Sequence, residues 1–222
     1  MCGVIGFTSP DTTYQDLCVV RRVMIESRIR GKHASGIAWS DSRSIHSEVR
    51  AIPIDELAES FDFHKLLKTT TKVSLIAHAR YSTSNILFNQ PIVGVHHAIA
   101  HNGVITQASP DSWEKTYGYH CNTENDSELL LRCIENDDNP YQVFPDSSYA
   151  AIVLNHKGEL SPFRNGLRPL WSGTIGKGTV FASTYDILNR AGVSNISQVI
   201  TFSEDLQRRN WNSWKTHKNR IT

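Results

Sequence analysis

The sequence predicts an α+β fold in which helices cover antiparallel sheets. Segments with the pattern of β-strands outnumber segments with the pattern of helices. Neighbouring strand segments are often separated by short turns that contain glycine, which is typical of hairpins. Both observations favour antiparallel sheets over a doubly wound parallel fold.

The N-terminal segment is predicted to form a strand followed by a helix. Residues 2–7 are small and apolar, as in a buried strand that starts at the chain terminus. Residues 13–29 carry apolar side chains close to helical spacing. We expect this helix to end at Arg30 and Gly31, with Gly31 as a left-handed cap.

The central part of the chain is predicted to be rich in strands. Apolar runs predict one helix, at residues 54–68, and four strands, at residues 35–39, 44–52, 73–79 and 97–101. The tripeptide His101-Asn102-Gly103 follows the last of these strands, where we expect a turn.

The second half contains a helix, two hairpins and a short final helix. Residues 125–137 predict the first helix, because Asn125 or Asp126 can cap its start and Glu128 follows at capping-box spacing. One hairpin pairs residues 149–155 with 159–164 around Lys157-Gly158, and the next pairs 170–174 with 178–183 around Gly176 and Gly178. The final helix is predicted at residues 184–191.

Length and composition indicate one sizeable core. The chain has 222 residues, of which 39% are hydrophobic and 20% charged, and a formal net charge of +1. This charge points to neither a nucleic acid nor a membrane as the main partner. No apolar run is long enough to span a bilayer, and the N-terminus lacks the pattern of a secretory signal. We therefore expect a cytoplasmic protein.

The cysteines and histidines do not form a recognisable metal-binding pattern. The four cysteines are widely scattered, without a CxxC pair, at positions Cys2, Cys18, Cys121 and Cys133. This spacing argues against a zinc site and against a disulfide framework, and it fits a reducing compartment. The ten histidines contain no HExxH motif. No metal ion or cofactor is expected.

Cys2 is the first residue with a chemical role of its own. Its small size permits removal of Met1, after which the mature chain begins with a cysteine that has a thiol and a free α-amine. An α-amine has a pKa near 8, roughly, so it can accept a proton near neutral pH. One residue then supplies both nucleophile and base. Taken alone, a cysteine at position 2 is more often an accident.

Five short blocks occur in the order seen in a known family. They are residues 2–7 (CGVIGF), 28–37 (RIRGKHASGI), 78–83 (HARYST), 101–103 (HNG) and 126–128 (DSE). Together they resemble the class II glutamine amidotransferases, which include the glutaminase domains of glucosamine-6-phosphate synthase and glutamine phosphoribosylpyrophosphate amidotransferase. The resemblance spans roughly residues 2–190, and it implies the N-terminal nucleophile hydrolase fold, a four-layer αββα sandwich of two antiparallel sheets.

The resemblance implies that Cys2, Asn102 and Gly103 are catalytic. Amide hydrolysis through a thioester passes through oxyanions, which need hydrogen-bond donors aimed at the developing charge. Asn102 offers a side-chain amide and Gly103 a backbone N–H that no Cβ blocks. Without the other blocks, Asn-Gly would be interpreted as an ordinary hairpin turn.

The resemblance also implies residues that bind free glutamine. Arg80 would hold the α-carboxylate with its planar guanidinium, Thr83 would add a hydroxyl, and Asp126 would pair with the α-ammonium. The structural alternatives are a surface ion pair for Arg80 and a helix cap for Asp126. Where the family often has a histidine after the threonine, this chain has Ser84, a departure that affects one substrate contact and leaves the core mechanism unchanged.

Two further segments match the family without a clear chemical role. Arg30 is expected to order the N-terminal region beside Cys2 and to border the substrate, and a purely structural role is nearly as well supported. Residues 164–170 (RNGLRPL) resemble a segment of the phosphoribosylpyrophosphate enzyme. We interpret this segment as scaffold, a turn and strand start without chemistry.

The predicted organisation is one glutamine amidotransferase domain, residues 2–202, followed by a tail, residues 203–222. About thirty residues follow the last recognisable element, too few for a synthase domain, so ammonia would pass to a separate synthase or ligase. The tail is basic and contains Trp211 and Trp214. A solvated end explains it best, followed by docking to a synthase, and then by nucleic-acid binding.

The sequence thus predicts a stand-alone glutaminase that hydrolyses L-glutamine through a Cys2 thioester. Two alternatives keep the same fold. One is an amidase that acts on another linear amide; the pairing of Arg80 with Asp126 argues for a free amino acid instead. The other is a catalytically weak regulatory or binding subunit, against which the intact Cys2, Asn102 and Gly103 argue.

Overall fold

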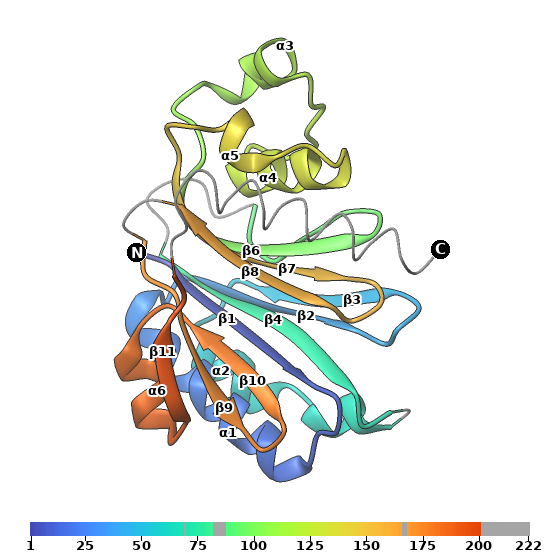
Figure 1. Cartoon of the computed structure of the whole chain (residues 1–222), viewed down its shortest axis with the longest axis vertical. Helices are drawn as coiled ribbons and strands as arrows, with labels where there is room; N and C mark the ends of the chain where they lie inside the picture. Colours follow the sequence, from blue (N-terminus) through green and yellow to red (C-terminus); the bar gives the residue numbers. More distant parts are fainter. Residues whose placement is uncertain (69, 82–87, 166–167, 201–222) are drawn as a thin grey trace.

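The computed structural model describes residues 1–68, 70–81, 88–165 and 168–200. Two antiparallel sheets lie face to face, and each is covered by helices on its outer face (Figure 1). The four layers therefore run helix, sheet, sheet, helix. This arrangement confirms the α+β prediction and the αββα sandwich that the family resemblance implied.

The larger sheet has seven strands. They are β1 (Gly3–Ser9), β2 (Ala34–Ser40), β3 (Ile45–Arg50), β4 (Val73–Arg80), β9 (Trp171–Ile175), β10 (Gly178–Ala182) and β11 (Ser194–Gln198). Their order in the sheet is β11-β9-β10-β1-β4-β2-β3, so the N-terminal strand β1 lies near the centre. The register pairs Gly3 with Ala79, which places the start of β1 beside the end of β4.

The smaller sheet has four strands in the order of the chain. They are β5 (Ile92–Val93), β6 (His97–Val104), β7 (Ser148–Asn155) and β8 (Leu160–Asn165). The pairing of β6 with β7 extends along the whole of both strands, from His97 opposite Asn155 to Val104 opposite Ser148. The turn between β7 and β8 has Gly158 in the left-handed region, as expected for the predicted hairpin.

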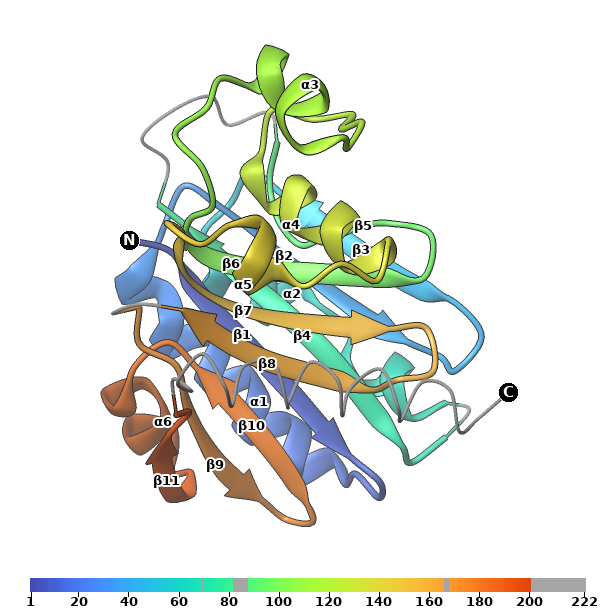
Figure 2. The same ribbon diagram turned by 45° about the horizontal axis from the view of Figure 1, so that its top comes forward.

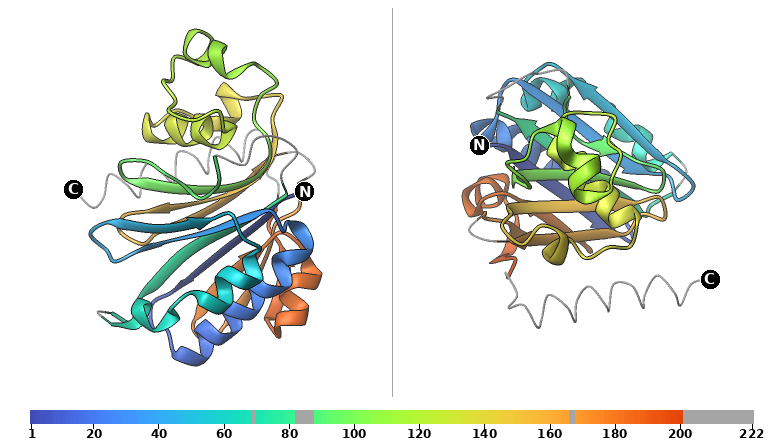
Figure 3. Two further views of the ribbon diagram at one scale, coloured as in Figure 1. Left: turned by 180° about the vertical axis from the view of Figure 1, so that it is seen from behind. Right: turned by 90° about the horizontal axis from the view of Figure 1, so that it is seen from above.

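Helices form the two outer layers (Figures 2 and 3). The larger sheet is covered by α1 (Tyr14–Glu26), α2 (Ile54–Ser60) and α6 (Tyr185–Ala191). The smaller sheet is covered by α4 (Asp126–Glu135) and α5 (Pro140–Val143), with α3 (Trp113–Tyr117) further out. Single 3-10 turns are η1 (Ser27–Arg30), η2 (Phe63–Leu67) and η3 (Pro110–Ser112).

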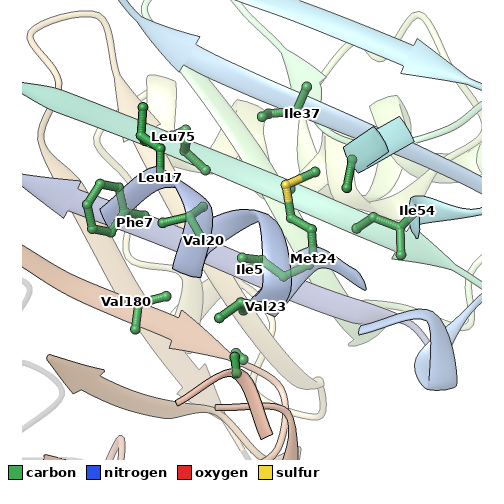
Figure 4. Close-up of a cluster of buried hydrophobic side chains, with 14 of the residues drawn as sticks. Ile5, Phe7, Leu17, Val20, Val23, Met24, Ile37, Ile54, Leu75 and Val180 are labelled. Atoms are coloured by element: carbon green, nitrogen blue, oxygen red, sulfur yellow. The ribbon is translucent and has the colours of Figure 1, made fainter. Parts of the chain in front are cut away.

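Helix α1 shows how the sequence specifies the outer core. Thr13 caps its start by accepting a hydrogen bond from the Asp16 backbone N–H, and the Asp16 carboxylate accepts one from the Thr13 N–H in return. The apolar side of the helix, including Leu17 and Met24, then packs on β1 and β4 (Figure 4). Burying this face stabilises the helix more than its intrinsic propensity does.

A separate apolar layer fills the space between the two sheets. Val4 and Ile76 from the larger sheet pack against Ala100, Ala150 and Ile152 from the smaller one. The next residues along β1 and β4 point the other way, into the helix-covered core. Because β4 is buried on both faces, its sequence is mostly apolar and lacks the regular alternation of a surface strand.

Two predictions about local structure were wrong. Gly31 has an extended backbone with φ of −173°, so it is not a left-handed cap. A Cβ there would lie 2.3 Å from the carbonyl carbon of Arg80, so glycine is needed because β4 passes so close. The predicted helix 54–68 is divided into α2 and η2, because the chain is extended at Phe61 and Asp62.

The sequence analysis did not predict five short elements, namely β5, η3, α3, α5 and β11. None of the helices among the described residues is long and apolar enough to cross a membrane. The tail, residues 203–222, lies outside the described residues, so the structure does not test the interpretation of this segment.

Candidate active site

A pocket of about 570 Å³ opens where the two sheets meet at the N-terminal end of β1. In Figures 1 and 3 the chain start emerges between the sheets at this end. The pocket is lined by five of the seven residues predicted for the site, namely Cys2, Arg80, Asn102, Gly103 and Asp126. Segments far apart in the sequence thus meet here, as the family resemblance implied.

Cys2 precedes the first strand and is held by its backbone. The Arg30 Nε donates a hydrogen bond to the Cys2 carbonyl at 3.3 Å, although Arg30 does not line the pocket. The Cys2 thiol is partly exposed and forms no disulfide, and it donates a hydrogen bond to the Tyr81 carbonyl oxygen at 3.9 Å. Its sulfur can therefore be reached from the pocket.

Asn102 and Gly103 lie within β6, where they pair with β7. The prediction of a turn at His101-Asn102-Gly103 was therefore wrong. Gly103 has φ of +149°, and a Cβ there would lie 2.1 Å from the carbonyl oxygen of Ser148. Only glycine fits this position. The tripeptide is a specialised strand end, and sequence reasoning mistook its glycine for a turn signal.

The side-chain nitrogen of Asn102 is the clearest sign of a ligand. Asn102 is only 3% exposed, and its Nδ2 has no hydrogen-bond partner among the described residues. It lies on the same side of β6 as Ala98 and Ala100, which face the other sheet. A buried amide without a partner is costly unless a ligand accepts its hydrogen bond.

Arg80 ends β4 and lines the pocket. Its Nη1 donates hydrogen bonds to the Phe88 carbonyl and, at 2.7 Å, to the Asn89 side chain. Burial lowers the pKa of the Arg80 guanidinium, and the nearby Cys2 thiolate opposes this shift. Arg80 therefore orders residues 88–89 and also places positive charge beside Cys2.

Asp126 is the first residue of α4, and Asn125 caps that helix by accepting a hydrogen bond from the Ser127 N–H. One Asp126 oxygen accepts a hydrogen bond from the Ile105 N–H at 2.8 Å. The other lies 4.0 Å from the His101 Nδ1. Asp126 thus fixes the end of β6 and keeps one oxygen for a second partner.

Thr83 and Ser84 lie outside the described residues.

Sequence reasoning missed two buried histidines beside these residues. His78, on β4, and His101, on β6, both line the pocket. Burial lowers the pKa of His78 to about 3 and also lowers that of His101, whose Nδ1 lies 2.7 Å from the Ser127 hydroxyl. Both are neutral at neutral pH. The sequence could have identified them, because each histidine is the first residue of a block that resembles the family, HARYST for His78 and HNG for His101.

Arg168 also lines the pocket, although its segment was interpreted as scaffold. Its Nη1 lies 3.8 Å from the Met1 sulfur. The only signal in the sequence was the arginine itself, in a segment without other polar chemistry. Within the described part of the chain, no group of three His, Cys, Asp or Glu residues is arranged to hold a metal ion.

Comparisons with known proteins agree with this fold. No family model matches the chain. A structure of glutamine phosphoribosylpyrophosphate amidotransferase from B. subtilis, complexed with ADP and GMP, has a TM-score of 0.69 and 22% identity, covering 90% of this chain and 46% of that one. A structure titled the allosteric regulatory enzyme of purine biosynthesis has a TM-score of 0.66 and 21% identity, with 90% and 45% coverage. The chain therefore has the N-terminal nucleophile hydrolase fold.

A sequence relative supports the same family. The chain is 27% identical over 171 residues to an amidophosphoribosyltransferase from Pasteurella multocida (strain Pm70). This match covers 71% of the chain and 32% of the relative, so the chain spans about a third of that protein. Sequence and fold together relate the chain to the class II glutamine amidotransferases.

Proposed function

We propose that this chain is a glutaminase that hydrolyses L-glutamine to glutamate and ammonia through a thioester on Cys2. The observation that carries the proposal is the unpartnered Asn102 amide, which lines the same pocket as the Cys2 thiol. A nucleophile together with a buried donor that lacks an acceptor is what thioester chemistry requires, because each tetrahedral oxyanion needs such a donor.

The first half of the proposed reaction forms the thioester. With Met1 removed, the α-amine of Cys2 accepts the thiol proton, and the sulfur attacks the side-chain amide carbon of glutamine. Asn102 and the Gly103 N–H donate hydrogen bonds to the oxyanion. The C–N bond then breaks, and the amine returns the proton to the departing ammonia. Water hydrolyses the thioester by the same route and releases glutamate.

The pocket also has charges that suit the backbone of a free amino acid. Arg80 is positive and Asp126 is negative, and both line the pocket. We assign Arg80 to the α-carboxylate and Asp126, through its second oxygen, to the α-ammonium. Thr83 stays a proposed contact, and Arg30 acts on the substrate indirectly, by holding Cys2.

We infer further that the ammonia is passed to a separate synthase or ligase. The related protein from Pasteurella multocida is about three times the length that this chain matches. The tail, residues 203–222, is a candidate docking segment. Deleting residues 207–222 should then abolish association with a co-purifying partner, and unchanged association would exclude this role. We also propose a reducing compartment such as the cytoplasm, because a free thiol nucleophile persists there.

Hydrolysis of two substrates distinguishes the proposal from a general amidase. Ammonia release is measured for L-glutamine and for glutaramate, which has the same amide but no α-ammonium group. We expect glutamine to be preferred by at least tenfold in kcat/KM, and Asp126→Asn to remove most of that preference. Equal rates for both substrates would support the amidase alternative. No hydrolysis of either would support a binding protein.

A further inference from the structure

Arg168 lies at the amine end of the catalytic cysteine. Its Nη1 is 3.8 Å from the Met1 sulfur, and both residues line the active-site pocket. The Met1 carbonyl carbon is bonded to the Cys2 nitrogen, which becomes the free α-amine when Met1 is removed. Removal of Met1 therefore opens space between the Arg168 guanidinium and the new amine.

Arg30 provides a second positive charge near the same nitrogen. Its Nε donates to the Cys2 carbonyl, and its Nη2 is buried without a partner among the described residues. Burial lowers the pKa of the Arg30 guanidinium; the Cys2 thiolate opposes this, and the charge of Arg168 adds to it. The two guanidinium groups are thus close enough to repel each other.

We propose that Arg168 is a positioning residue that keeps the mature α-amine of Cys2 unprotonated, because its positive charge destabilises the ammonium form. This inference rests on the proposed function, which makes that amine the base. An ordinary α-amine has a pKa near 8, roughly, so only about a tenth of it is neutral at pH 7. Each unit by which the pKa falls raises that fraction by up to tenfold.

The other charges around the amine partly oppose this effect. Asp126 and Glu124 also line the pocket and favour the ammonium form, although one Asp126 oxygen is bound to the Ile105 N–H. Arg80 adds a third positive charge. His78 and His101 are neutral at neutral pH, because burial lowers the pKa of both.

The side of Arg30 away from the pocket is nearly balanced in charge. There a second, smaller cavity is lined by Glu26, Asp186 and Arg190 as well as Arg30 itself. Within the described part of the chain, the two cavities together are lined by four arginines and four carboxylates, so their charges balance. Arg168 contacts Met1 and Arg30 contacts Cys2, so these two positive charges lie closest to the amine and dominate there.

The test measures the pKa of the α-amine without any substrate. The chain that begins at Cys2 is prepared with methionine aminopeptidase and verified by intact mass. The amine is then labelled with a trace of acetic anhydride across pH 5–10, and its reactivity is read from the N-terminal peptide. We expect Arg168→Gln to raise the amine pKa by about half to one unit. Arg168→Lys should leave the pKa close to the wild-type value.

Controls separate the electrostatic role from a structural one. Arg43→Gln removes a charge from the turn between β2 and β3, away from the pocket, and should not change the amine pKa. If Arg168→Gln does not fold, Arg168→Met replaces it. In the wild type, raising NaCl from about 50 mM to 1 M should raise the amine pKa, because salt screens the positive field.

The outcomes also separate this inference from the proposed function. An amine pKa that is the same in wild type and Arg168→Gln, or that does not respond to salt, overturns the role of Arg168. A chain that keeps Met1 under these conditions overturns it as well. A shifted pKa in a protein that releases no ammonia from glutamine supports the role of Arg168 and contradicts the glutaminase.

Discussion

The side chain of Asn102 shows most clearly how a single residue points to function. Its Nδ2 is buried without a partner among the described residues, which costs stability in the free protein. Some neighbouring polar groups are satisfied, such as the Gln90 side-chain oxygen, which accepts a hydrogen bond from the His101 N–H at 2.6 Å, but ring nitrogens of His78 and His101 also have no partner among the described residues. The amide nitrogen of Asn102 is a donor at every pH, and the oxyanion that the proposed reaction forms would accept its hydrogen bond.

At this scale we predict that Asn102→Ala lowers kcat for glutamine hydrolysis by about 10²- to 10³-fold, because the oxyanion loses a donor. The free energy of unfolding should not fall by more than about 1 kcal/mol, since no hydrogen bond is lost in the free protein. Asn136→Ala, at the exposed end of α4, is the control. Similar kcat values for the two variants would contradict the assignment.

Gly103 permits a second prediction at the residue scale. Gly103→Ala places a Cβ 2.1 Å from the Ser148 oxygen at a φ of +149°, so β6 and β7 must separate. We expect a loss of at least about 3 kcal/mol in unfolding free energy. Gly118 also has a positive φ, +76°, but a Cβ there would have no atom within 4 Å. Gly118→Ala should therefore cost only about 1 to 2 kcal/mol in unfolding free energy. Urea titrations of both variants measure this difference, and equal losses would refute the steric explanation.

Individual residues also show the limit of sequence reasoning. Cys2, Arg80, Asn102, Gly103 and Asp126 were all predicted for the site, and the structure brings all of them to one pocket. Arg168 was not, because an arginine beside a proline gives no sign of where its guanidinium lies. Its place depends on the fold of two sheets, which pattern analysis alone does not supply.

At the scale of elements, the start of α4 determines the pocket wall. Glu128 is 2% exposed, and its carboxylate accepts hydrogen bonds from the Asn122 and Thr123 N–H groups and from Arg132. The predicted capping box is therefore not formed. The Glu128 carboxylate binds backbone N–H groups of the loop before the helix and not that of Asn125. That loop leads directly to Glu124 and Asn125, which line the pocket.

We predict that Glu128→Gln lowers the free energy of unfolding by about 1 to 3 kcal/mol at pH 7. Burial raises the pKa of Glu128, but the hydrogen bonds from Asn122, Thr123 and Arg132 outweigh it, so the pKa is lowered overall. A carboxyl whose folded pKa is lowered stabilises the protein above its unfolded pKa of about 4.3, and this is lost as the pH falls through the folded value. The difference between wild type and variant should therefore shrink below about pH 4.

Urea titrations at pH 7 and pH 3 check this prediction. Glu114→Gln, at an exposed position whose carboxylate contacts only the exposed His120 among the described residues, serves as the control and should change little at either pH. A Glu128→Gln difference that is the same at both pH values would show that the charge of Glu128 contributes nothing.

Long elements could be predicted from the sequence, and short ones could not. The helix after β1 and both C-terminal hairpins were confirmed, because their apolar periodicity and glycine turns are local signals. The two-residue strand β5 and the four-residue helix α5 are too short to show a period. The end of β6 was mistaken for a turn, because the dipeptide Asn-Gly is also common in hairpin turns and the sequence does not distinguish the two.

At the scale of the whole molecule, the stacking of the sheets brings the site together. A Cβ on Gly6 would lie 2.8 Å from the Ile152 side chain of the opposite sheet, which shows how closely the sheets approach. The sequence predicts each sheet through its hairpins. It does not predict which faces meet, because the strands between the layers are apolar on both sides. Only the family resemblance supplied the four-layer arrangement.

We predict that Ile152→Ala destabilises the whole molecule by about 2 to 5 kcal/mol, because Ile152 is fully buried between the sheets. Unfolding should remain a single transition, with fluorescence and circular dichroism giving the same midpoint. Val95→Ala, at a residue that is 75% exposed, should change the unfolding free energy by less than about 0.5 kcal/mol. Two separate transitions would show that the sheets fold independently.

The central claim is that Cys2, freed from Met1, is a nucleophile directed at glutamine. Intact mass of the purified protein, before and after treatment with the reactive glutamine analogue 6-diazo-5-oxo-norleucine, tests it most directly, with Cys2→Ala as the control. We predict loss of Met1 and one covalent adduct on the wild type alone, and excess L-glutamine should slow its formation. A processed chain that gains no adduct, or an equal adduct on Cys2→Ala, would contradict the claim.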